Sequence, residues 1–174
     1  MANKYNFEFE LSNSSIQGLI RELSIYQKDL VNSKTYILQA LADYTHERVV
    51  YHIANSVGNT TGKYVDYMPT DNLINNIKVS KIIDDMVRVI ADTEYAKYVE
   101  YGTGIEGAKN PHIKASEAGW EYSDGSWVYH ASDGNFYRTE GLPAHNFMYN
   151  AWLDLKENYK MIMKQVLRER GLLK

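Results

Sequence analysis

The chain has 174 residues, a formal net charge of −3 and no cysteine. Without cysteine, neither a disulfide framework nor a thiolate metal site can form, and 19 Lys and Arg against 22 Asp and Glu give no electrostatic basis for wrapping nucleic acid. No apolar run approaches the ~20 residues of a membrane span and the first residues lack the apolar core of a signal peptide, so we expect a protein that does not enter a membrane.

The first third of the chain predicts a short strand followed by helices. Tyr5, Phe7 and Phe9 alternate with polar residues, as in a strand or an extended arm. Apolar residues then recur at helical spacing, break near Asn32-Ser33, and resume as far as Gly58. We therefore expect two helices, or one bent helix, before an exposed loop that ends at about residue 71. The stripe comprises Ile16, Leu19, Ile20, Leu23, Tyr26, Leu30, Leu38, Leu41, Ala42, Thr45, Val49, Ile53 and Val57.

The middle of the chain predicts antiparallel strands. Residues 73–79 and 82–91 are short and rich in Ile and Val, and Ser80-Lys81 separates them, as in an antiparallel pair. Because Asp85 falls on the apolar side of the second segment, we expect a bulge or a late start there. Further hairpin arms are indicated by aromatic residues, with turns at Asp124-Gly125 and Asp133-Gly134. These aromatic residues are Trp120, Tyr122, Trp127, Tyr129, Phe136 and Tyr137.

The last element predicted is a helix from about Asn146 to Arg170, ended by Gly171. Asn146 is expected to cap its first N–H groups, and Phe147 to anchor its first turn. The whole predicts a single α+β domain, residues 1–174, in which an antiparallel sheet packs with two N-terminal helices and one long C-terminal helix. The helix also carries a basic stripe, which most simply is a solvated face and otherwise meets an acidic partner or passing DNA. The stripe is Lys156, Lys160, Lys164 and Arg168.

Several patterns that suggest chemistry have simpler interpretations. The GxGxxG at residues 102–107 precedes a segment that contains Pro111, so a glycine turn is favoured over a dinucleotide site. Asp84-Asp85, Glu94 and Glu100 lack a companion at diagnostic spacing, and we interpret them as solvated strand ends. Trp120 and Trp127 are interpreted as cross-strand packing partners rather than sugar platforms. The five histidines contain no i, i+4 pair, and no G-x-S-x-G elbow occurs. The histidines are His46, His52, His112, His130 and His145.

Two segments have more distinctive sequence patterns than the rest of the chain: residues 91–104, ADTEYAKYVEYGTG, and residues 141–152, GLPAHNFMYNAW. Aromatic rings with polar tips can pack on a core and present their other side to a partner, so we interpret the pair as a docking device. The residues expected to act in structure and interaction are Tyr95, Tyr98, Glu100, Tyr101, Gly102, Thr103, Trp120, Trp127, Pro143 and Phe147.

These segments resemble the signature of a family of tailed-bacteriophage neck proteins, the gene-product-ten-like tail-completion or head-to-tail joining proteins. The family pattern has a Tyr-Ala, a short gap, Val-Glu-aromatic-Gly-Thr, a variable insertion, and Pro-Ala-x-Pro-Phe before the last helix. Residues 95–96 and 99–103 match its first half, and 143–144 with Phe147 match its second. Residues 69–73 look like a degraded form of a Pro-x-Asp-Thr-Gly-x-Leu segment. Asn146 stands where proline is usual, and a glycine is missing near Asn72.

The resemblance implies a non-enzymatic structural protein of a tailed phage or prophage, with no catalytic residue, cofactor or metal. It implies a ring, commonly of six subunits, around the channel through which DNA leaves without sequence-specific binding. Its partners would be head-completion or connector proteins and a tail terminator or tail-tube protein, and it would lie in the virion neck after synthesis in the host cytoplasm. Residues 105–142 would form the variable loop or hairpin insertion. Ring number and orientation stay open.

Other classes also stay open. A minor capsid or tail-tube-associated protein would share these features. A small carbohydrate-binding or receptor-binding module could use the two tryptophans and the tyrosines, and would show ligand-dependent quenching of tryptophan fluorescence. A nuclease or peptidoglycan hydrolase would need clustered acids around a metal or cleft, and mutation of Asp84, Asp85 or Glu100 would then abolish activity.

Overall fold

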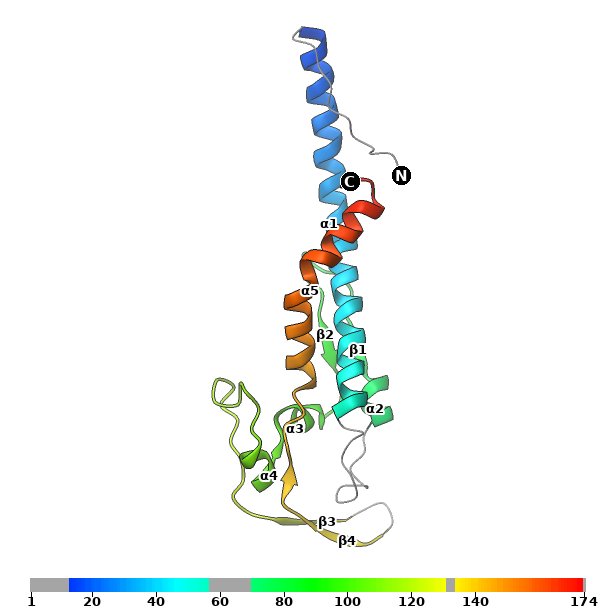
Figure 1. Cartoon of the computed structure of the whole chain (residues 1–174). Coiled ribbons are helices and arrows are strands. Elements are labelled where there is room, and N and C mark those ends of the chain that lie inside the picture. Colours follow the sequence, from blue (N-terminus) through cyan, green and yellow to red (C-terminus); the bar gives the residue numbers. More distant parts are fainter. Residues whose placement is uncertain (1–12, 57–69, 131–133, 174) are drawn as a thin grey trace.

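The computed structural model describes residues 13–56, 70–130 and 134–173. Two long helices, α1 (Asn13–Ser56) and α5 (Phe147–Glu169), run side by side for part of their length. The short elements α3 (Ala96–Tyr101), α4 (Gly104–Lys109), β3 (Trp127–His130), β4 (Phe136–Thr139) and β5 (Gly141–Leu142) gather at the end opposite to the start of α1 (Figure 1). The molecule is therefore elongated, with a helical half and an irregular half.

The predicted α+β class is confirmed, but the sheet is divided. β1 (Ile77–Val79) pairs antiparallel with β2 (Val89–Ala91), and β3 pairs antiparallel with β4, as two separate two-stranded sheets. The first hairpin turns at Asp84 and Asp85, both with positive φ, rather than at Ser80-Lys81. The late start expected in its second strand is confirmed, because β2 begins only at Val89.

Other predicted elements differ from the structure. Residues 70–75 form a helix, α2 (Thr70–Asn75), so the strand expected from residue 73 begins only at Ile77. Trp120 and Tyr122 lie outside any strand, and α4 occupies part of the segment expected to be a loop. The motif at residues 102–107 follows helix α3 and not a strand, so it lacks the context of a dinucleotide fingerprint. The predicted strand near Tyr5, the loop at residues 59–69 and Asp133 lie outside the described residues.

Of the two alternatives expected here, two helices or one bent helix, the structure has a single helix, because α1 is continuous through Asn32-Ser33. Ser33 is fully buried; its Oγ donates to the carbonyl oxygen of Asp29 at 2.8 Å and accepts from Nε of Arg170 at 2.7 Å. The hydroxyl is thus satisfied inside the helix instead of competing with its backbone. The serine of the pair that suggested a break thus marks a contact with the end of α5.

The core lies where α1, α2, β1, α3 and α5 meet. Phe147 and Ala151, near the start of α5, belong to one buried cluster with residues of α1 and α3. Fully burying a side chain of the size of Phe147 contributes about 2 kcal/mol from area alone. The buried residues of this cluster are Val49, Ile53, Leu73, Ile77, Ala96, Val99, Phe147 and Ala151.

A partly buried ion-pair cluster joins the two long helices. Oδ2 of Asp154 on α5 accepts from Nε of Arg48 at 2.6 Å and lies 2.7 Å from Nε2 of His52, both on α1. Burial would raise the pKa of Asp154, but the hydrogen bonds from Arg48 and His52 outweigh it and lower the pKa below its ordinary value. The carboxylate therefore favours the packed helix pair.

No helix among the described residues is long and apolar enough to cross a membrane.

Candidate functional site

The chain leaves the body of the protein at Gly102–Gly104 and returns at Gly141–Leu142, and these two segments are bonded to each other. Thr103 bridges Leu142, and Gly104 bridges Gly141, both antiparallel. The backbone N–H of Leu142 also donates to Oγ1 of Thr103 at 3.1 Å. We call residues 105–140 the insertion, and residues 100–104 together with 141–149 the base of the insertion. The base closes the insertion into a loop with adjacent ends.

Two glycines allow these segments to approach so closely. Gly141 has φ of 100°, and a Cβ at this position would lie 1.9 Å from the carbonyl oxygen of Thr103. Gly104 has φ of 59°, and its Cβ would lie 2.5 Å from the carbonyl oxygen of Glu140. Both the left-handed backbone and the absent side chain are needed. The glycine turn that the sequence indicated is therefore half of a two-segment junction.

The base also holds the start of α5. Glu100, at the end of α3, is buried, and its carboxylate accepts from the backbone N–H groups of Met148 at 2.9 Å and Tyr149 at 3.0 Å. These are unpaired donors of the first turn of α5, where a negative charge also complements the helix dipole. Each such charge-assisted bond contributes on the order of 1.5–3 kcal/mol. Glu100 thus caps a helix that begins 47 residues later in the chain.

Two sequence predictions are corrected here. Asn146 does not cap α5 with its side chain: it adopts a left-handed backbone with φ of 54°, and its Nδ2 donates to the carbonyl oxygen of Ala144 at 3.3 Å. Glu100 is not a solvated strand end, because it is only 7% exposed. The cap expected from the neighbouring residue comes instead from a distant acid.

His112 completes the environment of Glu100. Its Nε2 lies 3.0 Å from Oε1 of Glu100, and its Nδ1 accepts from the backbone N–H of Lys114 at 2.9 Å. Because Nδ1 is an acceptor, Nε2 carries the proton and donates to the carboxylate. The imidazole also packs against Tyr101, with ring centroids 4.4 Å apart. A residue of the insertion is thereby fixed to the base.

Tyr122 and Trp120 tie the insertion to the same place. The hydroxyl of Tyr122 accepts from the backbone N–H of His112 at 3.0 Å and donates to the carbonyl oxygen of Tyr101 at 2.8 Å. The indole N–H of Trp120 donates to the carbonyl oxygen of Gly102 at 3.1 Å, and its ring stacks on Tyr101. Trp120 is therefore an anchor to the base and not the cross-strand partner that we expected.

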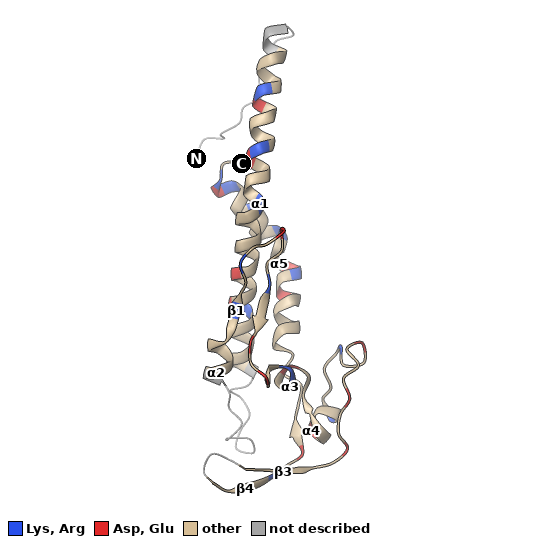
Figure 2. Ribbon diagram, turned by 180° about the vertical axis from the view of Figure 1, so that it is seen from behind, with Lys and Arg blue, Asp and Glu red and all other residues tan. Residues whose placement is uncertain are grey.

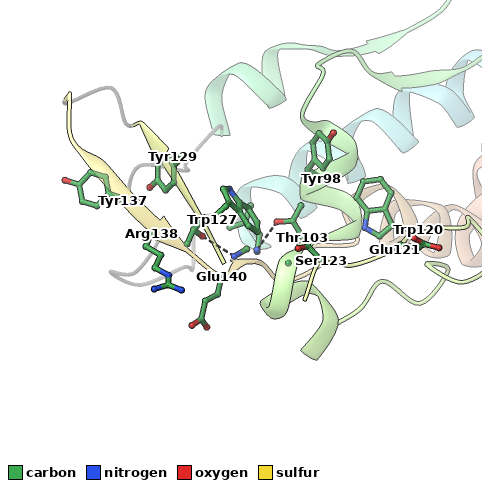
Figure 3. A pocket seen from close by; sticks show the side chains of 14 residues that line it. Tyr98, Thr103, Trp120, Glu121, Ser123, Trp127, Tyr129, Tyr137, Arg138 and Glu140 are labelled. Atoms are coloured by element: carbon green, nitrogen blue, oxygen red, sulfur yellow. Dashed lines mark hydrogen bonds between the residues drawn. The ribbon is translucent and has the colours of Figure 1, made fainter. Parts of the chain in front are cut away.

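Between the segment around Trp120 and the β3–β4 hairpin, the insertion lines a cavity of about 620 Å³. Trp120 and Glu121 lie on one side of it, Tyr129 and Tyr137 on the other, and Trp127 lies between them near Thr103 (Figure 3). Trp127, Tyr129 and Tyr137 come from one face of the β3–β4 hairpin, because alternate strand residues share a face. The hairpin thus lines the cavity with aromatic rings.

The rings of this cavity are accessible. Trp127, Tyr137 and Tyr98 are each about 40% exposed, and Glu121, Arg138 and Glu140 add charges of both signs to its lining. Large rings with polar tips, flanked by a few charged groups, are typical of surfaces that bind other molecules. We call this surface the aromatic pocket.

The structure brings most of the predicted interaction residues together. Tyr98, Thr103, Trp120 and Trp127 line the aromatic pocket. The others lie at the base or next to it: Glu100, Tyr101, Gly102, Pro143 and Phe147 surround the start of α5, and Tyr95 precedes α3.

Four residues of the site were not among the predicted interaction residues: His112, Tyr122, Tyr137 and Tyr149. His112 and Tyr122 lie within the insertion, and no spacing relates them to Glu100. Only the hairpin pattern gave a usable signal: Tyr129 and Tyr137 face each other across the strands, with ring centroids 6.0 Å apart.

Among the described residues, no group of three or more His, Asp or Glu side chains is placed to hold a metal ion. Asp84, Asp85 and Glu94 are exposed and lie away from the pocket lining. The basic stripe of α5 is exposed along its length and lies outside the pocket as well.

Comparison of the chain with protein-family models, with curated proteins and with solved structures gave no match.

Proposed function

We propose that this protein is a non-enzymatic structural component of a tailed-phage neck, which joins the head connector to the tail as a ring around the DNA channel. The observation that carries the proposal is the base of the insertion. The two segments that resemble the neck family, separated by about forty residues in the sequence, are bonded to each other and to the start of α5. The family-like residues thus act together as one structural unit.

The aromatic pocket supports a role in assembly. A ring requires two different surfaces on each subunit, since every copy contacts its neighbours head to tail. The pocket is one such surface: it is aromatic, partly exposed, and held by a base that intrachain hydrogen bonds fix. The contact we propose places part of a neighbouring copy, or of a neck partner, against Trp127 and Tyr137.

The charge distribution fits a channel that DNA passes without sequence-specific binding. The net charge is −3, and Lys and Arg are interspersed with Asp and Glu along both long helices (Figure 2). Recognition of base sequence would be expected to need a basic patch with side chains directed into a groove. Head-completion and tail-terminator or tail-tube proteins are the partners we propose for the two faces of the ring.

The proposal is tested by deleting the gene for this protein from its phage or prophage genome. We expect lysates of the deletion to contain DNA-filled heads and separate tails, seen by electron microscopy, and expression of the wild-type chain from a plasmid to restore joined particles. Mass photometry of the purified chain is expected to show a ring species, commonly six times the mass of one chain. Normal joined particles from the deletion would contradict the proposal.

The kind of incomplete particle that accumulates in the deletion lysate distinguishes a neck protein from the related structural roles. A minor capsid protein would leave defective heads, and a tail-tube-associated protein would leave short or absent tails. A neck protein leaves both parts complete and unjoined.

A second candidate function, a saccharide-binding module, is favoured by one observation: a cavity of about 620 Å³ lined by Trp127 and several tyrosines. Sugar rings stack on such aromatic faces, and the nearby carboxylates could accept bonds from hydroxyl groups. Titration with host cell-wall saccharides would then quench tryptophan fluorescence in the wild-type chain and not in Tyr137→Ala. Unchanged fluorescence across the titration would remove this candidate.

A further inference from the structure

Helix α1 extends well beyond the end of α5 (Figure 1). The C-terminal end of α5 is fixed next to Ser33 and Tyr36, because Nε of Arg170 donates to Oγ of Ser33 at 2.7 Å and its guanidinium lies 4.0 Å from the centre of the Tyr36 ring. Residues 16–31 lie before this point. We call them the α1 arm.

The α1 arm is rich in exposed apolar side chains. Exposed fractions are 43% for Ile16, 51% for Ile20 and 47% for Leu23. Most of the stability of a helix in a protein comes from packing one apolar face, and exposed rows of Ile and Leu usually mark a surface that another molecule covers. The exposed apolar residues of the arm are Ile16, Ile20, Leu23, Ile25, Leu30 and Val31.

The spacing of the arm indicates what covers it. Ile16, Leu23 and Leu30 are seven residues apart, and Leu19 and Tyr26 stand three residues after the first two. These are the a and d positions of two heptads, the pattern by which one helix packs along another of the same kind. Val49 and Ile53, which are buried in the core farther along α1, lie 33 and 37 residues after Ile16 and so fall outside these a and d positions. The seam of the arm is therefore a different face of α1 from the one that the core covers.

The charges beside the stripe favour a second copy aligned in parallel. In a parallel pair, the residue before one a position meets the residue five places later in the partner helix. Asp29 of one copy would then meet Lys34 of the other, and Glu22 would meet the neutral Gln27. Within one chain Lys34 pairs with Asp85, and both side chains are more than half exposed, so this pair can rearrange at little cost.

We propose that the α1 arm pairs with the α1 arm of a second copy of this chain, in parallel and in register. Ile16, Leu19, Leu23, Tyr26 and Leu30 form the seam. Two heptads make a short seam, so in the isolated chain the pairing depends on concentration, and a larger assembly that holds two arms close together strengthens it. The pairing is separate from the aromatic pocket and stands whether or not the protein belongs to a phage neck.

Cysteine cross-linking of the full chain tests the proposal, because the natural sequence has no cysteine that could interfere. Leu23→Cys places one thiol at an a position, and Ile25→Cys places one on the same turn outside the seam. The two residues are matched in exposure, at 47% and 48%. Under mild oxidation we expect a disulfide-linked dimer from Leu23→Cys and a monomer from Ile25→Cys.

A second pair of variants measures the strength of the contact. In sedimentation equilibrium over a range of chain concentrations, Leu23→Glu is expected to weaken self-association by on the order of tenfold or more relative to Ile25→Glu. Circular dichroism of each variant serves as the control for folding. Absence of a cross-linked dimer from Leu23→Cys, equal cross-linking of both cysteine variants, or equal association of both glutamate variants would overturn the proposal. Gene deletion, by contrast, tests the neck function without reference to the arm.

Discussion

The base of the insertion and the β3–β4 hairpin differ in how firmly the rest of the chain holds them. At the base, a buried carboxylate, two glycines and several tyrosine and tryptophan hydrogen bonds join three segments of the same chain. In the hairpin, Phe136 is 74% exposed and Val128 is 61% exposed, and a two-stranded ribbon alone is only marginally stable in water. The base is therefore held by contacts within the chain, whereas the hairpin leaves large side chains exposed, and we propose that it contacts other molecules.

Substitution of Gly141 is expected to have the largest effect on stability. In Gly141→Ala the new Cβ would lie 1.9 Å from the carbonyl oxygen of Thr103, on a backbone with φ of 100°. We expect the free energy of unfolding, measured by urea titration, to fall by more than about 4 kcal/mol. Gly119→Ala is the control, because φ is 63° there but no atom lies within 4 Å of the Cβ, and about 1 kcal/mol is expected. Equal losses would show that the junction is not tightly closed.

Removal of the Glu100 carboxylate is expected to be the next most costly change. Glu100→Ala leaves two N–H groups of α5 and the Nε2–H of His112 without their acceptor, so we expect a loss of about 3 kcal/mol. Glu100→Gln keeps the shape and one acceptor oxygen and is expected to lose about half as much. Glu117→Gln is the control, since Glu117 is exposed and pairs only with Lys114 in the described structure; its effect should stay within about 0.5 kcal/mol. The urea midpoint at constant m-value measures all three.

The Asp154 cluster predicts a smaller, pH-dependent effect in the helix pair, outside both regions. The pKa of Asp154 is lowered in the folded state, so its contribution is present above the ordinary pKa of the carboxyl group and is lost as the pH falls through the lowered value. Asp154→Asn is expected to cost about 1 kcal/mol at neutral pH and nothing at low pH. Asp43→Asn, on an exposed part of α1, is the control. A difference between Asp154→Asn and wild type that persists unchanged to low pH would refute the assignment.

Some of this arrangement follows from the sequence. The helical spacing of apolar residues near the end of the chain, together with Gly171, predicts α5 to within a residue or two at each end. The two antiparallel pairs are predicted as well, but with the first turn misplaced at Ser80-Lys81 and with a further arm at Trp120 that does not form. These signals are local, so one segment is enough to reveal them.

The rest depends on contacts between distant segments. Nothing near Glu100 indicates that α5 needs its carboxylate, and nothing near Ser33 indicates that Arg170 satisfies its hydroxyl. Because of such tertiary partners, the helix is continuous at Asn32-Ser33, where a break was expected. For the same reason Glu100, which was expected to be solvated, is a buried cap. The aromatic pocket was predicted only in part, because its lining combines α3, the hairpin and the segment around Trp120.

The smallest effects on stability are expected for substitutions in the β3–β4 hairpin. Because such variants stay folded, they can test function. Tyr137 and Phe136 are neighbours on opposite faces of β4; Tyr137 lines the aromatic pocket and Phe136 does not. Tyr137→Ala and Phe136→Ala should each change the free energy of unfolding by less than about 1 kcal/mol, because both side chains are exposed.

The most direct test is the fraction of DNA-filled heads that carry tails, counted by electron microscopy in lysates of the gene deletion complemented with each variant. If the aromatic pocket is the docking surface, Tyr137→Ala yields mostly unjoined heads and tails, whereas Phe136→Ala restores joined particles to the wild-type fraction. Wild-type joining by Tyr137→Ala, or equal loss in both variants, would contradict the role of the pocket in assembly.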